Sequence, residues 1–202
     1  QIPGLSGAAS APAGGSHALA LLSDGSVKAW GWNQYGQLGD GTTLQRTTPT
    51  TISALQDVVA VSAGDRHSLA LLDDGTVMAW GNNANGQIGD GTQIDRHSPT
   101  IVSGLPAIAA ISAGKLYSLG LGVDNSVWAW GRNADRQLGD GTTTMRLTPV
   151  QIAGPGMAWK IAVPVLSVAS GTYSTEQTVT VTGADLDASV HYTTDGSEPT
   201  QE

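Results

Sequence analysis

His17, His67 and Tyr117 occupy the same position in three similar stretches of this sequence, and the two histidines are its best candidates for proton transfer. A general base needs a nucleophile and an orienting acid beside it. A position that holds a phenol in place of an imidazole does not meet that need. We therefore expect these side chains at strand ends, hydrogen-bonded to backbone groups, and we predict no catalytic role for them.

Aspartate recurs before glycine at 40–41, 90–91 and 140–141, and such carboxylates could hold calcium. A calcium site takes roughly six to eight oxygen ligands, and one aspartate per loop does not supply them. Asp-Gly is a common turn sequence because both residues tolerate the left-handed backbone conformation. We expect turns at these places and no metal site.

Other catalytic signatures are also missing from the sequence. The chain has no Cys, which rules out disulfides, a thiol nucleophile and a Cys-based zinc site. Lys115 follows a glycine but precedes Leu116, so the Gly-Lys-Ser/Thr sequence that cradles phosphates is not formed. The sequence predicts a protein that is not an enzyme and that needs no cofactor.

Charge is spread unevenly along the chain. Residues 1–162 contain all nine Lys and Arg together with eleven Asp, whereas residues 163–202 contain six acidic residues and no Lys or Arg. A nucleic-acid surface needs clustered cations, so we expect no nucleic acid partner. No apolar run approaches the roughly 18 residues that span a bilayer, which predicts no membrane insertion.

These residues are positioned by a repeat of fifty residues. Residues 16–26 return as 66–76 and 116–126, Trp-Gly stands at 30–31, 80–81 and 130–131, and Pro closes each copy at 49, 99 and 149. Periods of roughly 40 to 50 residues are typical of propeller blades. We divide residues 1–162 into repeats 1–50, 51–100 and 101–150 and the start of a fourth at 151–162.

Each repeat contains a predicted β-hairpin. In the second copy the apolar runs 67–72 and 77–80 flank Asp73-Asp74-Gly75-Thr76, and an Asp-Gly turn between apolar runs is a strong hairpin signal. Both faces of these strands are largely apolar, which favours sheets buried on both sides, as in stacked blades. Pro12 interrupts the strand that opens the first copy, so we expect a weakened edge strand there.

The wording of the repeat resembles the regulator of chromosome condensation repeat: His-Ser-Leu-Ala-Leu, then Asp-Gly-Thr-Val, Ala-Trp-Gly-Asn-Asn, Gly-Gln-Ile-Gly-Asp-Gly-Thr and Pro. That resemblance covers residues 1–162 and implies a propeller of about seven four-stranded blades. Only about three are present, so the predicted fold is an all-β, incomplete β-propeller. Trp30, Trp80 and Trp130 precede Gly at strand ends, which favours packing over any light-sensing role.

Residues 163–202 differ in character from the repeats. The run Tyr192-Thr-Thr-Asp-Gly-Ser-Glu-Pro-Thr200 resembles the immunoglobulin-like module found at the C-terminus of chitobiase and β-hexosaminidase. We predict a truncated immunoglobulin-like β segment there.

An open stack of blades would leave an apolar face of roughly 400 Å² uncovered, equivalent to about 10 kcal/mol. We therefore expect missing blades or self-association with a second copy to complete the array, or else a marginal, aggregation-prone protein.

Binding residues are sought where the copies differ, since loops on a rigid scaffold carry recognition. The variable windows are 15–16, 32–36 and 43–47 and their equivalents in the other two copies. Aromatic and Arg side chains dominate binding hot spots. The candidates in these loops are Trp32, Tyr35, Asp65, Arg66, Lys115, Tyr117, Arg132, Asp135 and Arg136.

The leading hypothesis is a non-enzymatic protein–protein interaction module, a fragment of a larger extracellular or cell-surface protein, probably bacterial in origin. The alternative is an accessory, carbohydrate-associated region of a larger glycoside hydrolase, with a glycan as partner. A regulator resembling a guanine nucleotide exchange factor fits less well, because the chain is acidic and has no basic tail.

Overall fold

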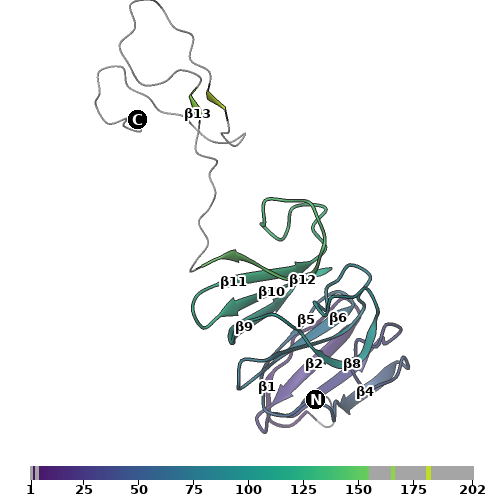
Figure 1. Cartoon of the computed structure of the whole chain (residues 1–202). Coiled ribbons are helices and arrows are strands. Elements are labelled where there is room, and N and C mark those ends of the chain that lie inside the picture. The colour runs from purple at the N-terminus through teal and green to yellow at the C-terminus, as the bar shows by residue number, and fades with distance from the viewer. Residues whose placement is uncertain (1, 3–4, 155–164, 167–180, 183–202) are drawn as a thin grey trace, which may run out of the picture. The chain divides into compact units, whose positions relative to one another are not determined.

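The structure is a computed structural model that describes residues 2, 5–154, 165–166 and 181–182 (Figure 1). The chain divides into two compact units, Gln1–Met157 and Ala158–Glu202. In the second unit β13 (Val165–Leu166) pairs with β14 (Val181–Thr182) in antiparallel fashion. The rest of the expected immunoglobulin-like segment, and the boundary expected after residue 162, lie outside the described residues.

The first unit is built of three four-stranded antiparallel sheets, and in each of them the strands follow one another in chain order. We call these sheets blade 1, blade 2 and blade 3. Blade 1 contains β1 (Ala8–Ser10), β2 (His17–Leu22), β3 (Val27–Gly31) and β4 (Arg46–Thr51); blade 2 contains β5 (Val58–Ala63), β6 (His67–Leu72), β7 (Val77–Gly81) and β8 (Arg96–Ile101); blade 3 contains β9 (Ile108–Ala113), β10 (Tyr117–Gly122), β11 (Val127–Gly131) and β12 (Arg146–Ala153). Every regular element in the described residues is a strand, so this part of the chain holds no helix that could cross a bilayer.

The hairpin in the middle of each blade forms where the sequence predicts it. In blade 2, Leu71 pairs with Val77 across the turn, and Gly75 adopts a φ of 84°. Asn125 takes the equivalent place in blade 3 with a φ of 65°, a conformation that asparagine tolerates better than most residues. The turn sequence therefore determines the register of the two strands that carry most of the core.

Blade 1 has the weakened edge strand that Pro12 predicts. β1 has three residues, all exposed, whereas β5 and β9 have six each. Its register with β2 shifts between Ala8 and Ser10. Proline cannot donate a hydrogen bond to a neighbouring strand, so the strand ends before Pro12.

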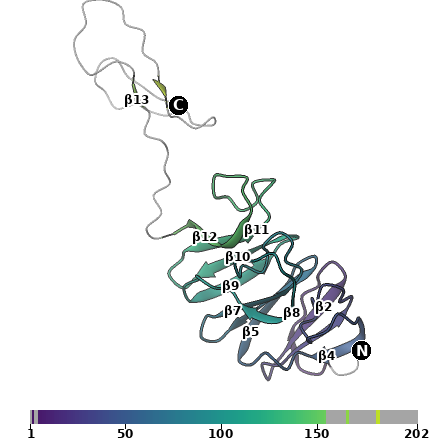
Figure 2. The same cartoon turned by 45° about the vertical axis from the view of Figure 1, so that its right-hand side comes forward.

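The blades stack face to face, and the hydrophobic core lies between them (Figure 2). One face of blade 1 presents Leu19, Leu21 and Val27, which pack in one cluster with Ala70 and Trp80 of blade 2. We call the side of a blade that faces the next blade its forward face and the opposite side its rear face. The same arrangement recurs between the forward face of blade 2 and the rear face of blade 3, where Trp130 enters the cluster. The prediction of two-sided burial is confirmed for blade 2.

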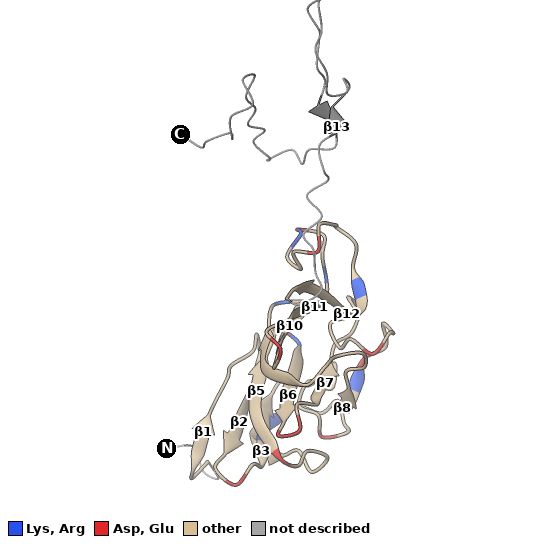
Figure 3. Ribbon diagram, turned by 60° about the vertical axis from the view of Figure 1, so that its left-hand side comes forward, with Lys and Arg blue, Asp and Glu red and all other residues tan. Residues whose placement is uncertain are grey.

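Charged residues are concentrated in turns and loops (Figure 3). No Lys, Arg, Asp or Glu occurs in β5, β6 or β7. Because both faces of these strands are covered by neighbouring blades, a charge there would be buried without a partner at considerable cost.

Candidate functional site

The conserved-looking histidine position of the repeat is a contact between blades. His17 Nε2 lies 2.9 Å from Ser68 Oγ of blade 2, and Ser68 Oγ donates to the carbonyl oxygen of Gln37 at 2.9 Å. Burial lowers the pKa of His17 to about 4, although nearby Asp65 works in the opposite direction. The expectation that this side chain bonds to backbone was wrong: the imidazole reaches the serine hydroxyl of the neighbouring blade, and only that hydroxyl bonds to backbone.

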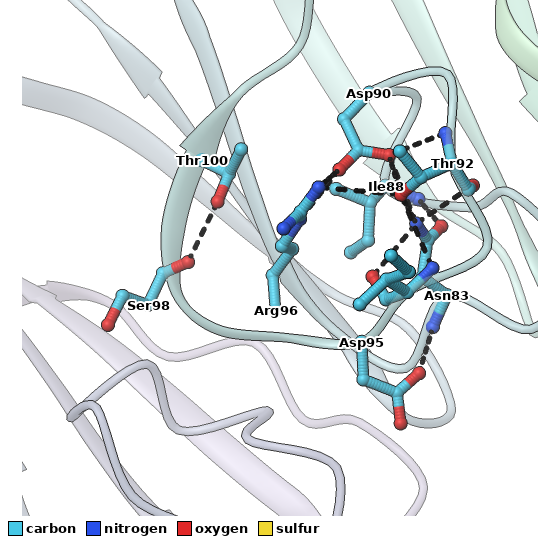
Figure 4. A network of polar contacts seen from close by, with 9 residues as sticks. Asn83, Ile88, Asp90, Thr92, Asp95, Arg96, Ser98 and Thr100 are labelled. Atoms are coloured by element: carbon cyan, nitrogen blue, oxygen red, sulfur yellow. Dashed lines mark hydrogen bonds and ion pairs between the residues drawn. The ribbon is translucent and has the colours of Figure 1, made fainter.

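The aspartates before glycine hold the loop that leads to the last strand of each blade. Asp90 Oδ1 accepts hydrogen bonds from Thr92 N at 3.0 Å, Thr92 Oγ1 at 2.7 Å and Asn83 Nδ2 at 3.1 Å. Asp90 Oδ2 accepts from Arg96 Nε at 2.6 Å (Figure 4). These carboxylate oxygens are thus directed at donors of their own loop, which supports the turn interpretation.

Blade 3 has the same network. Burial disfavours the charged form of Asp140, but hydrogen bonds from Thr142 and Arg146 outweigh it and lower the pKa of this carboxyl to about 2. The carboxylate is therefore ionised at neutral pH and belongs to the framework of the loop.

A cluster of Trp32, Tyr35 and Arg66 lies on the loop side of the stack. The two rings meet edge to face with centroids 5.3 Å apart. Arg66 Cζ lies 5.7 Å from the centroid of Trp32 and 5.4 Å from that of Tyr35, and Arg66 Nη1 donates to Tyr35 Oη at 3.1 Å. Cation–π contacts of this kind order exposed side chains, so the loops of blades 1 and 2 are joined in one surface.

An open hollow of about 800 Å³ lies beside this cluster and above blade 2. Its wall combines amides, both signs of charge and an apolar side chain, Ile94, which is 63% exposed. All three blades contribute to it. The lining residues are Tyr35, Asp65, Arg66, Asn82, Ala84, Asn85, Gln93, Ile94, Asp95, His97, Lys115 and Leu116.

The structure brings some of the candidate binding residues together. Tyr35, Asp65, Arg66 and Lys115 line the hollow, and Trp32 contacts two of these through the cluster. Asp65 also pairs with Arg66 at 3.4 Å. That these residues bind a partner stays a prediction.

The four candidates from blade 3 are not among the residues that line the hollow. Tyr117 lies in β10 with its ring against Gly114. Arg132 pairs with Asp135 at 3.0 Å in a separate loop, where Arg136 adopts a φ of 60°.

Several lining residues were not singled out from the sequence. Ile94, Asp95 and His97 lie in one variable window, and Asn82 and Asn85 in another. Membership of those windows was the available signal, but amides and a single isoleucine are common in solvated loops. Only the fold shows that the two windows face each other.

Comparison with protein families places this architecture. The model of the regulator of chromosome condensation (RCC1) repeat matches residues 24–71, 74–121 and 124–175, well over half of the chain. The chain therefore belongs to the family of RCC1-repeat proteins, whose blades form β-propellers. Within that family it carries three RCC1 repeats followed by a match to the chitobiase/β-hexosaminidase C-terminal domain at residues 168–202. Both resemblances expected from the sequence are confirmed.

Solved structures agree with the fold. Prp20p from Saccharomyces cerevisiae superposes with a TM-score of 0.68 at 24% identity, covering 75% of this chain and 40% of that one. Human WBSCR16 gives a TM-score of 0.64 at 24% identity, covering 71% of this chain and 37% of the other. The predicted incomplete propeller is thus confirmed.

Curated relatives match over short segments. An endoglucanase of Clostridium saccharobutylicum is 47% identical over 49 residues, 24% of this chain and 11% of the relative. The mouse secretion-regulating guanine nucleotide exchange factor is 43% identical over 51 residues, 25% of this chain and 11% of the relative. These matches therefore span about a tenth of each relative's length.

Proposed function

We propose that this chain is a non-enzymatic protein-interaction module that binds its partner on the loop side of blade 2. The observation that carries the proposal is the Trp32–Tyr35–Arg66 cluster at the edge of a hollow that also exposes Ile94. Trp, Tyr and Arg are the residue types most enriched at binding hot spots. Here they are held in place by one another before a partner arrives, which reduces the entropy lost on binding.

The hollow suits a peptide segment of mixed charge. Arg66 and Lys115 can meet acidic side chains, Asp65 and Asp95 can meet basic ones, and Ile94 offers an apolar contact. Charged groups at the rim of an interface contribute mainly to specificity and association rate. The partner's affinity would therefore depend chiefly on the aromatic residues, Arg66 and Ile94.

Structural neighbours support a binding role for such blades. Prp20p was studied for its binding to Gsp1p and histones, and yeast RCC1 (Prp20) was solved with Kap60 bound to it. The present chain spans 40% or less of those chains, so their partners are not transferred to it. What we take from them is the use of RCC1 blades as a scaffold for protein contacts.

A second candidate is an accessory region of a larger glycoside hydrolase, with a glycan as ligand. It is favoured by the match of residues 168–202 to the chitobiase/β-hexosaminidase C-terminal domain and by the match to a bacterial endoglucanase. Both also fit our proposal that the parent protein is bacterial and acts outside the cell or at its surface. A role like that of an exchange factor has only the short match noted above in its favour.

The test compares two isoleucine-type positions. A partner is first isolated by photo-crosslinking from p-benzoylphenylalanine placed at Tyr35, and its dissociation constant is then measured by calorimetry. Ile94→Asp and Arg66→Ala should each weaken binding at least about tenfold. Leu44→Asp is the matched control, because Leu44 holds the same repeat position in blade 1, is 64% exposed and does not line the hollow.

Equal binding by all three variants would refute the loop side of blade 2 as the contact surface. A glycan array that gives a signal abolished by Ile94→Asp and Arg66→Ala, with no protein crosslinked, would favour the second candidate.

A further inference from the structure

Each junction between blades is closed by a tryptophan of one blade inserted into the loop of the preceding one. Trp80 Nε1 donates to the carbonyl oxygen of Gln37 at 2.9 Å, and Trp130 Nε1 donates to that of Gln87 at 3.0 Å. Both indoles are fully buried. We call this tryptophan the plug, and the glycine and glutamine carbonyl that receive it the socket.

The socket glycine has no room for a side chain when the plug is in place. A Cβ at Gly39 would lie 2.7 Å from Trp80 Nε1, and one at Gly89 would lie 2.8 Å from Trp130 Cδ1. Each socket carbonyl accepts a second hydrogen bond from the next blade, from Ser68 or Ser118. The two junctions of the stack thus have the same construction.

Blade 3 carries a third socket, and the described residues do not fill it. A Cβ at Gly139 would have only Ile152 Cδ1 within reach, at 4.0 Å. In the described part of the chain no donor reaches the carbonyl oxygen of Gln137, the counterpart of Gln37 and Gln87. Leu121 on the same forward face is 40% exposed, whereas its equivalents Leu21 and Leu71 are 6% and 3% exposed.

Blade 1 carries an unused plug at the opposite end. Trp30 is half-buried, unlike its counterparts Trp80 and Trp130. Among the described residues its indole nitrogen has no hydrogen-bond acceptor, while both counterparts have one. One molecule therefore displays a free plug on one end and a free socket on the other.

We propose that the open socket of blade 3 binds the Trp30 plug of a second copy of this chain, head to tail. The contact repeats the geometry of the two junctions within the chain, so the forward face of one copy covers the rear face of the next. Such a contact joins unlike surfaces and extends into rings or open chains rather than stopping at a symmetric dimer.

A change of residue size on both faces fits this pairing. Within the chain, the imidazoles of His17 and His67 meet the hydroxyls of Ser68 and Ser118. At a head-to-tail contact, the corresponding residues are Tyr117 on blade 3 and Ala18 on blade 1. The larger phenol would thus face the smaller methyl group, and no hydroxyl of Ala18 would be needed to complete the contact.

Lys28 is the one charged residue in the strands of the rear face of blade 1, where blades 2 and 3 have Met78 and Trp128. Its alkyl stem can cover apolar surface while the ammonium group stays in water. This position is therefore compatible with a covering blade.

The test uses complementary variants of the whole chain, studied by sedimentation velocity and light scattering over a range of concentrations. Wild type should show an average mass that rises above the 20.6 kDa of one chain. Trp30→Ala removes the plug and Leu121→Asp blocks the forward face, so each variant alone should remain monomeric. An equimolar mixture should form a one-to-one dimer and nothing larger, because one intact plug and one intact socket remain.

Two controls separate this contact from other surfaces. Trp32→Ala removes an exposed tryptophan of the loop cluster, and Ile101→Asp alters an exposed strand position that is polar in the other two blades. Both should assemble as wild type does. Since Trp32 belongs to the proposed binding surface, the loss of partner binding without loss of assembly would distinguish the two proposals.

A wild-type protein that stays monomeric at the highest concentration would overturn the proposal. So would a mixture that remains two monomers, or a monomer whose Trp30 is shielded from acrylamide quenching, since another part of the same chain would then cover the site. Near-ultraviolet circular dichroism confirms that each variant is folded, and Trp30→Ala tests the contact from the other end if Leu121→Asp is not.

Discussion

His17 Nε2 lies 2.9 Å from Ser68 Oγ, across the junction between blades 1 and 2, and His67 and Ser118 repeat the contact at 3.0 Å between blades 2 and 3. All four side chains are buried. Apolar faces alone could slide past one another, whereas a buried hydrogen bond is satisfied in one register only. The blades are thus aligned by a polar contact at the strand ends and joined by apolar packing along the strands.

Removing one hydroxyl should test this alignment. Ser68→Ala leaves His17 Nε2 without its partner and removes one donor from the carbonyl oxygen of Gln37. We expect the free energy of unfolding to fall by about 1 to 3 kcal/mol, measured by urea denaturation. Ser103→Ala, at an exposed loop position, should change it by less than about 0.5 kcal/mol.

The buried histidines should make the protein sensitive to mild acid. Burial lowers the pKa from 6.5 to about 4 in His17 and to about 3 in His67. Above pH 6.5 neither the folded nor the unfolded state takes up these protons, so their full contribution is present. Below it the unfolded chain binds protons that the folded chain refuses, and stability falls as the pH approaches the folded pKa values.

We expect a loss of about 2 to 3 kcal/mol per histidine between pH 7 and pH 4.5, measured by urea denaturation at each pH. The double variant His17→Gln/His67→Gln should lose much less over that interval. The pKa values of Asp40, Asp90 and Asp140 are lowered from 3.8, so these carboxylates affect stability only at lower pH. A wild-type protein equally stable at both pH values would contradict the burial of the histidines.

Asp90 should matter far more than an aspartate at a hairpin turn. Asp90→Asn weakens the hydrogen bonds from Thr92 and the ion pair with Arg96. We expect a loss of about 2 kcal/mol, moderated because Arg96 is one-third exposed. Asp74→Asn, which changes an exposed turn residue, should cost less than about 1 kcal/mol by the same thermal or urea measurement.

Equivalent glycines should respond differently according to whether a plug lies against them. Gly89 and Gly139 have φ values of 78° and 72°, so alanine brings similar backbone strain to both. At Gly89 the new Cβ also meets Trp130, whereas at Gly139 the nearest atom is 4.0 Å away. In a Trp30→Ala background, where no second copy can fill the socket, Gly89→Ala should destabilise by about 2 kcal/mol more than Gly139→Ala.

Much of the fold follows from local sequence. The fifty-residue period, the turns at Gly75 and Asn125 and the interruption at Pro12 each act within a few residues of where they stand, so strand positions could be predicted. Apolar residues on both faces of the strands indicated stacking, because a sheet with one wet face would alternate.

Contacts between blades could not be predicted in the same way. His17 and Ser68 are separated by 51 positions, and Arg66 and Tyr35 by 31, and nothing in the local sequence of either residue points to the other. The hollow shows the same limit, since loops of three blades form it. Residue type alone selected Tyr35 and Arg66 correctly as neighbours, but it grouped with them Arg132 and Asp135, which pair with each other.

Exchange of the indole N–H protons, followed by nuclear magnetic resonance, tests the stacking of the three repeats most directly. In the Leu121→Asp variant, kept monomeric, Trp80 and Trp130 should exchange more slowly than Trp30 by about two orders of magnitude or more, because their nitrogens are buried and donate to Gln37 and Gln87. Similar exchange rates for all three indoles would show that the repeats are not consecutive blades joined by tryptophan, and would contradict the account.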